Sequence, residues 1–243
     1  MGKVLAIYLA ASPLFKGFVS GGERHFIEVL KRLNKEENMQ IDVLTSPVGK
    51  LILEGEGLNS SNFHIIKIPL DKVLCKSTIG FAAYYVLITL VFLAYKIYKI
   101  RCRYNLIIPS SHYVPDVLPG VIISMLTKAK LVIYFHLIEP PFLERVKYSS
   151  IISSILVWMA QSVAIVFAKK FAHIIFTYPA DKNKIAKLGV SMERVHIMFN
   201  GVDFSEIEKV KEDKKIYEAC FLARLTPYKG VFDIIAVSYT HLT

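Results

Sequence analysis

Short apolar runs alternate with stretches of helical periodicity along most of the chain, and this alternation constrains the possible folds more than any other feature. Such alternation predicts βαβ units, in which parallel strands are joined by helices that cover both faces of a sheet. The expected strands are KVLAIYLA, QIDVLTS, FHIIKIPL, NLIIPSS, KLVIYFH, AHIIFTYP, RVHIMFN and IYEACFLAR. The sequence therefore predicts an α/β fold with a Rossmann-like parallel sheet.

The stretch between the first two expected strands has the clearest helical pattern. Its apolar side chains recur at i, i+3, i+4 and i+7, which places one stripe against the sheet, at Phe26, Val29, Leu30 and Leu33. Ser20 and Glu23 fit the S-x-x-E capping box that opens a helix. A helix is therefore expected to begin beside Gly21 and Gly22.

The composition favours a globular protein with an anionic partner. The 243 residues are 53% hydrophobic, which is enough for one large or two modest domains. Lys and Arg number 30 against 20 Asp and Glu, and the formal net charge is +10. A field of this sign favours nucleic acid, a phosphorylated small molecule or an acidic lipid surface, and it does not choose among them.

The three cysteines, Cys75, Cys102 and Cys220, stand far apart in the sequence. Without paired cysteines or clustered histidines, the sequence indicates neither a disulfide framework nor a bound metal, and a reducing compartment fits best. The N-terminal KVLAIYLA run also has some features of a secretory signal peptide, because a Lys precedes a short apolar stretch that ends in small residues. We favour its interpretation as a buried first strand.

Two longer apolar runs, residues 77–95 and 148–168, contain 19 and 21 residues without a charge or a His. About 20 apolar residues suffice to span a membrane, and basic residues bracket both runs. Each run lies between two expected strands, so both are expected to be crossover helices of one sheet. A membrane protein with two spans and no catalytic activity remains the alternative, and peripheral docking on an anionic bilayer is a further expectation.

The run at residues 148–168 also contains polar residues at roughly helical spacing. They form a weak polar stripe on an otherwise apolar helix, at Ser150, Ser153, Ser154 and Gln161. This stripe predicts a helix that is poorly suited to face lipid.

The chain is expected to contain one complete domain and the beginning of another. Residues 1–199 form the first domain, and the charge-rich residues 200–215 form the linker. Residues 216–237 begin a second domain that is too short to hold its own core. Residues 238–243 are expected to be a non-native tail, because VSYTHLT is not expected to continue the helix that KGVFDIIA begins.

Candidate binding residues follow the expected strands. Gly21 and Gly22 open the capped helix, where free backbone N–H groups and the helix dipole favour a phosphate or a carboxylate, although a plain turn explains the glycines as well. His136 ends an apolar strand, at the edge of a parallel sheet where ligands bind in open α/β folds. His112 and Glu139 are weaker candidates of the same kind.

The C-terminal part contains two further motifs. FNGVDF, residues 199–204, is a turn by composition and includes Asn200. Arg224 and Lys229 flank a loop that contains a Pro, and they could converge on a diphosphate, Arg as a planar fork and Lys as a point charge. Two cations on an exposed loop without a ligand are the simpler interpretation.

Taken in order, SGGERHFIEVLKRL, a strand that ends in His136 before EPP, VHIMFNGVD and FLARLTPYKGVFDII resemble the family 4 type of retaining nucleotide-sugar glycosyltransferases, which have the two-domain GT-B fold. The resemblance covers nearly the whole chain in layout, and the last two motifs and the double glycine are its specific parts. It implies transfer of a sugar from a nucleotide-sugar to a glycan or lipid-linked acceptor, with retention and without a cofactor or bound metal.

The resemblance also implies roles for individual residues. Gly21, Gly22, Arg224 and Lys229 would bind the donor diphosphate, and His136 would lie beside the transferred sugar as the catalytic residue. The cleft or the acceptor side would include Arg24, His25, His112 and Asn200.

The sequence departs from the family pattern in two ways. Ala223 occupies a position where the family usually has Gly, and no Glu-x7-Glu element follows Lys229. The resemblance therefore implies a C-terminally truncated chain that does not catalyse transfer by itself.

The parent enzyme is expected to act in the cytoplasm, at the cytoplasmic face of a membrane. A nucleic-acid partner is not expected, because the aromatic residues lie mainly in apolar runs rather than beside the basic residues.

Overall fold

The structure is a computed structural model of the chain. It describes residues 2–11, 19–58, 62–68, 71–96, 104–136, 138–147, 149–176, 184, 186–201, 204–210, 220–223 and 229–241. The chain divides into two compact units, Met1–Asn200 and Gly201–Thr243, and each is described by itself below.

A parallel sheet of seven strands forms the centre of the first unit. The strands are β1 (Gly2–Tyr8), β2 (Met39–Thr45), β3 (Phe63–Ile65), β4 (Leu106–Pro109), β5 (Lys130–Phe135), β6 (Ala172–Phe176) and β7 (Val195–Ile197). They pair in the order β3-β2-β1-β4-β5-β6-β7, and every neighbouring pair is parallel. The predicted α/β fold with a Rossmann-like sheet is confirmed. Most of the eighth expected strand lies outside the described residues, and residues 220–223 within it are not a strand.

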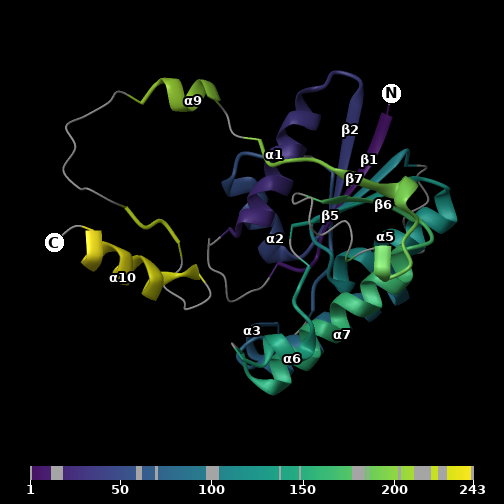
Figure 1. Cartoon of the computed structure of the whole chain (residues 1–243). Helices are drawn as coiled ribbons and strands as arrows, with labels where there is room; N and C mark the ends of the chain where they lie inside the picture. The colour runs from purple at the N-terminus through teal and green to yellow at the C-terminus, as the bar shows by residue number, and fades with distance from the viewer. Residues whose placement is uncertain are drawn as a thin grey trace. The chain divides into compact units, whose positions relative to one another are not determined.

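Helices cover both faces of the sheet (Figure 1). They are α1 (Gly21–Lys35), α2 (Pro47–Gly55), α3 (Asp71–Leu74), α4 (Thr78–Val91), α5 (Val114–Thr127), α6 (Phe142–Arg145) and α7 (Ile151–Ala168). One buried core joins the sheet to α1 and α2, and a second joins it to α4, α5 and α7. This division follows from the right-handed crossovers between parallel strands. The chain first moves from β1 to β3 in one direction across the sheet, which places α1 and α2 on one face. It then moves from β4 to β7 in the other direction, which places the later helices on the opposite face.

The predicted start of α1 is confirmed. The Ser20 hydroxyl accepts a hydrogen bond from the Glu23 N–H at 3.3 Å, and the Glu23 carboxylate accepts one from the Ser20 N–H at 2.8 Å. Phe26 and Leu30 from the predicted stripe are buried against the sheet, together with Ile27. The capping box therefore fixes where the helix begins, and the apolar stripe fixes which side packs.

The two long apolar runs are crossover helices, as expected. α4 and a following π-helical turn (Phe92–Lys96) connect β3 to β4, and α7 connects β5 to β6. β5 and β6 pair directly along five residues, so α7 connects two neighbouring strands of one sheet. This arrangement does not favour a protein with two membrane spans. Among the described helices, α7 alone has the length and composition of a membrane span, and 28% of its residues are buried.

Two members of the predicted polar stripe of α7 face inward. Ser154 and Gln161 are both buried and point toward the rest of the first unit. The solvent-facing side of the helix consists of large apolar residues instead. Periodicity shows that a helix has two different sides, but it does not show which side a neighbouring element covers.

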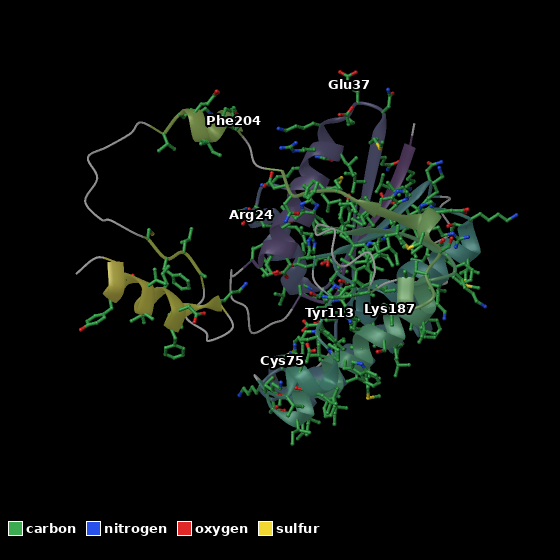
Figure 2. The ribbon with its side chains drawn as sticks, in the orientation of Figure 1. Arg24, Glu37, Cys75, Tyr113, Lys187 and Phe204 are labelled. Atoms are coloured by element: carbon green, nitrogen blue, oxygen red, sulfur yellow. The ribbon has the colours of Figure 1, made fainter. Side chains whose placement is uncertain are left out.

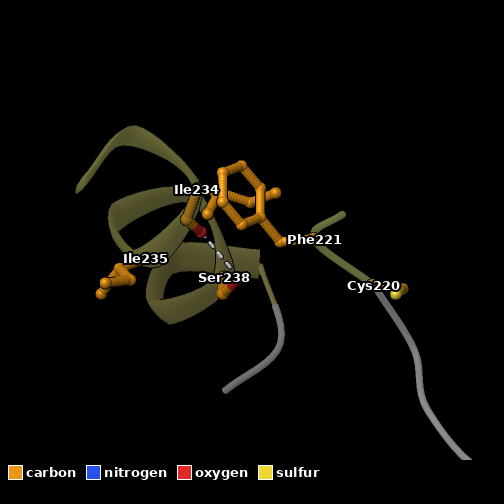
Figure 3. Close-up of a pocket in the computed structure, with 5 residues that line it drawn as sticks. All are labelled: Cys220, Phe221, Ile234, Ile235 and Ser238. Carbon is orange, nitrogen blue, oxygen red and sulfur yellow. Dashed lines mark hydrogen bonds between the residues drawn. The ribbon is translucent and has the colours of Figure 1, made fainter. Parts of the chain in front are cut away.

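The second unit contains the short helix α9 (Phe204–Glu208) and the helix α10 (Val231–His241). The prediction that residues 238–241 do not continue the helix is wrong, because α10 runs through them and the Ser238 hydroxyl donates to the Ile234 carbonyl at 2.7 Å. Neither Gly nor Pro interrupts these residues, so their weak propensity does not end the helix. A small apolar pocket lies between α10 and Cys220 and Phe221 (Figure 3).

Candidate functional site

The candidate site lies where the order of the strands reverses. β1 and β4 are neighbours, but β1 is followed by α1 on one face of the sheet and β4 by α5 on the other. The carboxyl ends of β1 and β4 are therefore a topological switch point of the sheet, and the crevice outside such a point is where open α/β sheets bind ligands. The start of α1 and the residues after β4 and β5 all reach this edge.

Gly22 and His136 meet at this edge. A Cβ atom added to Gly22 would lie 2.7 Å from Cδ2 of His136, whereas one added to Gly21 would meet nothing within 4 Å. The imidazole of His136 therefore lies on the backbone of the first turn of α1. This is the end of a helix where N–H groups and the positive end of the dipole favour an anion.

The contact predicts different effects for two adjacent glycines. We expect Gly22→Ala to lower the free energy of unfolding by about 1 to 3 kcal/mol, because the added methyl group displaces the His136 ring. Gly21→Ala should change it by less than about 0.5 kcal/mol, since the site is open. Urea denaturation of both variants and the parent chain measures the difference. Equal effects at the two positions would contradict the contact.

His25 adds a second imidazole next to His136. The ring centroids of the two histidines lie 5.3 Å apart in an edge-to-face arrangement, and His25 lies 5.1 Å from Tyr134. Burial, and to a smaller extent the charge of His25, lowers the pKa of His136 to about 4, and burial also lowers the pKa of His25. Both rings are therefore neutral near pH 7, and each can donate or accept a hydrogen bond.

His112 lies in the core below these histidines. Its ring stacks on Phe135 with centroids 4.8 Å apart, and only 6% of the residue is exposed. Burial, with a contribution from the charge of His136, lowers the pKa of His112 to about 4. His112 therefore supports the strand end that carries His136, and it is shielded from solvent.

Asp116, near the start of α5, joins the ends of β1 and β4. Its carboxylate is fully buried and accepts four hydrogen bonds, at 2.7 and 3.0 Å from the N–H groups of Leu9 and Ala10 and at 2.8 and 2.6 Å from the hydroxyls of Ser110 and Ser111. Burial raises the pKa of Asp116 to about 6, and these hydrogen bonds oppose the rise. The carboxylate thus fixes both loops that border the crevice.

Glu23 has a second partner besides the helix cap. The hydroxyl of Tyr8, at the end of β1, donates to the Glu23 carboxylate at 2.7 Å. Burial and the Glu23 charge raise the pKa of Tyr8 well above its usual value, so the phenol stays protonated. This bond holds the first turn of α1 to the end of β1. Sequence reasoning recognised the cap but missed Tyr8 and Asp116, because both act through contacts that are distant in the sequence.

The remaining predicted residues lie in other places. Arg24, on α1 (Figure 2), forms an ion pair with Glu56 after α2. The carboxylate of Glu139 pairs with Arg145 of α6. Asn200 is exposed at the end of the first unit.

In the second unit, Lys229 is exposed, and Arg224 falls outside the described residues. Within the part of the chain that the structure describes, no group of three or more His, Cys, Asp or Glu residues could hold a metal ion.

Comparison with known proteins gives one family and one curated relative. The profile of Glycosyltransferase Family 4 matches residues 19–206. An uncharacterized glycosyltransferase of Methanocaldococcus jannaschii is 24% identical over 240 residues, which cover 91% of this chain and 57% of the relative. The chain therefore spans little more than half the length of that relative.

Solved structures share the fold at low sequence identity. The N-terminal domain of Candida albicans trehalose-6-phosphate phosphatase matches with a TM-score of 0.51 and 14% identity, over 98% of this chain and 54% of that one. Arabidopsis thaliana UGT89C1, solved with UDP, matches with a TM-score of 0.51 and 10% identity, over 83% of this chain and 49% of that one. At these identities the similarity concerns the fold alone, a Rossmann-like domain of the GT-B type.

Proposed function

Because the chain belongs to glycosyltransferase family 4, we propose that it carries the acceptor-side domain of an enzyme that transfers a sugar from a nucleotide-sugar to a glycan or lipid-linked acceptor. The observation that carries the proposal is the contact of His136 with the backbone of Gly22, at the edge where the strand order reverses. The start of a helix, which favours an anion, thus lies beside a neutral imidazole. The helix start suits the diphosphate of a nucleotide-sugar, and the imidazole suits a hydroxyl of its sugar.

In this proposal the N–H groups at Gly21 and Gly22 bind the diphosphate, and Arg224 and Lys229 neutralise it from the second domain. His136 lies beside the transferred sugar. Being neutral, it hydrogen-bonds a sugar hydroxyl without placing a charge in a buried site. His25 holds the His136 ring by its edge-to-face contact. Arg24 and His112 are proposed to take no direct part, because Arg24 is paired with Glu56 and His112 is buried. Asn200 stays on the cleft side in the proposal.

The transfer breaks the bond between the anomeric carbon and the phosphate oxygen and forms one to an acceptor hydroxyl. We propose that it proceeds with retention and without a metal, and that the proton of the acceptor passes to the departing phosphate, whose charge the basic residues offset. The 243 residues are proposed to need a longer second domain for turnover. The span of 57% of the curated relative supports this part. Cytoplasmic action is proposed from the wide spacing of the three cysteines in the sequence, which indicates no disulfide framework.

The test is a transfer assay with radiolabelled UDP- and GDP-sugars and a lipid and glycan extract as acceptor. It compares this chain with the reading frame extended to its genomic stop codon. We expect label in the extract with the extended chain, and a roughly 100- to 1,000-fold lower rate for its His136→Ala variant.

His173→Ala is the matched control and should keep the rate, because His173 lies on β6 against His196 rather than at the crevice. Absence of transfer from every donor, or equal loss in both variants, would overturn the proposal.

A further inference from the structure

α7 buries two polar residues and exposes many large apolar ones. The inner side contains Ser154 and Gln161, and Gln161 has a structural role, because its side-chain oxygen accepts the N–H of Glu139 at 2.9 Å. The outer side includes Ile152, Ile155, Trp158, Met159, Val163 and Val166, and all six are exposed. These six residues are called the α7 outer face below. Surface helices of soluble proteins show the opposite pattern.

The α7 outer face is continuous along the helix. At 100° per residue, its six members lie within about 140° of one another on the helix circumference. Trp158 is 46% exposed, and it is the single tryptophan of the chain. It lies near the middle of the face along the helix axis and at one edge of the arc around it. Phe167 and Phe171 extend the exposed apolar surface at the C-terminal end of the helix. Figure 1 shows α7 in the helical layer that also contains α5.

Positive charges lie at both ends of this apolar helix. Lys147 precedes α7 and Lys169 and Lys170 follow it, while α7 itself contains no charged residue. Amphipathic elements that lie in the membrane interface combine these features, because their apolar side enters the acyl boundary and their cations meet anionic headgroups. A tryptophan at this depth suits the interface, since its ring is apolar and its N–H is polar.

We infer that the α7 outer face docks on the surface of an anionic phospholipid bilayer, with the helix axis parallel to the membrane plane. The inference does not depend on the proposed transfer reaction. A membrane span is not compatible with it, because the strands before and after α7 pair within one sheet. Self-association through the same face is disfavoured, because two chains of charge +10 would bring their lysine-flanked helices together.

The intact 243-residue chain tests the inference through its own tryptophan. We expect Trp158 emission to shift to shorter wavelength when vesicles of phosphatidylcholine and phosphatidylglycerol are added. Lipids brominated near the headgroup end of the acyl chain should quench it more strongly than lipids brominated near the chain terminus. Pure phosphatidylcholine vesicles should bind at least about tenfold more weakly, and added salt should weaken the anionic binding.

Single charged substitutions locate the surface. Ile152→Glu and Val166→Glu, at positions that are 52% and 59% exposed, should each weaken vesicle binding at least about tenfold while leaving the thermal unfolding midpoint nearly unchanged. Leu51→Glu is the matched control on α2, which packs on the other face of the sheet. It should bind vesicles as the parent does, although Leu51 is 69% exposed.

Four outcomes would overturn the inference. These are no emission shift with anionic vesicles, equal binding to neutral vesicles, strongest quenching from the chain terminus, and equal weakening by Leu51→Glu. A shift that appears on raising the protein concentration without vesicles would assign the face to a second copy of the chain instead.

Discussion

Replacing Asp116 by Ala should lower the free energy of unfolding by roughly 3 to 5 kcal/mol, because each buried donor left without an acceptor costs about 1 to 3 kcal/mol. The variant removes the acceptor of the Leu9 and Ala10 N–H groups and of two serine hydroxyls. The hydroxyls can rotate toward other acceptors, but the backbone N–H groups cannot. Urea denaturation followed by circular dichroism measures the loss.

Asp116→Asn separates the hydrogen bonds from the charge. The amide oxygen can still accept the N–H groups of Leu9 and Ala10, and its NH2 group can donate to the hydroxyls of Ser110 and Ser111 after they rotate. We therefore expect the free energy of unfolding of this variant to fall by about 1 kcal/mol, much less than that of the Ala variant. An equal fall in the free energy of unfolding in the two variants would show that the hydrogen bonds of Asp116 do not stabilise the ends of β1 and β4.

The same comparison reports on function. Asp116 is fully buried and bonds to residues after β1 and β4, so we expect it to act by positioning the ends of these strands. In the proposed enzyme, the Asn variant should keep its affinity for the donor, and the Ala variant should lose affinity, because the loops that border the crevice are no longer tied together. Donor titration of the extended chain distinguishes positioning from a general loss of folded protein, provided that it is done well below the unfolding midpoint.

Patterns that act over a few residues predicted the fold well. Apolar runs located seven parallel strands, and Ser20 and Glu23 located the start of α1. These features depend on local hydrogen bonds and on periodic burial, and both are readable in sequence. Gly22 and His136 are candidates from the sequence alone, because a glycine at a helix start and a histidine at a strand end each have a chemical meaning by position, and the structure brings them into contact.

Features that depend on long-range packing were missed or misjudged. Asp116 is an unremarkable residue in SSHYVPD, and only the sheet brings it to Leu9 and Ala10, more than 100 residues away. The polar stripe of α7 is readable in the sequence, but only the structure shows that Gln161 faces inward and accepts the backbone N–H of Glu139. Periodicity identified the two sides of the helix, and only tertiary contacts decided which one faces outward.

Acid should destabilise the first unit between about pH 6.5 and pH 4. His112 has an ordinary pKa of 6.5 in the unfolded chain and about 4 when folded, so the unfolded state binds more protons in this window. Its contribution to stability is complete above pH 6.5 and is lost as the pH falls toward 4. The shift corresponds to roughly 3 kcal/mol. His136 shifts in the same direction and adds to the loss.

Asp116 acts in the opposite sense. Its pKa is higher in the folded state, about 6 against 3.8, so its contribution is complete below pH 3.8 and is lost as the pH rises through 6. The gain in stability from Asp116 on acidification therefore cancels roughly the loss from one of the two histidines, His112 or His136. We expect a net loss on the order of 3 kcal/mol from these three groups between pH 7 and pH 4.

Two variants should change this acid loss in opposite directions. His112→Phe keeps the stacking on Phe135 and removes the titration, so its stability should fall less between pH 7 and pH 4. Asp116→Asn removes the opposing group, so its stability should fall more. Urea denaturation at pH 7, 6, 5 and 4 measures all three chains. Parallel curves for the parent and both variants would contradict the assignment, because the acid loss would then arise from groups outside this buried cluster.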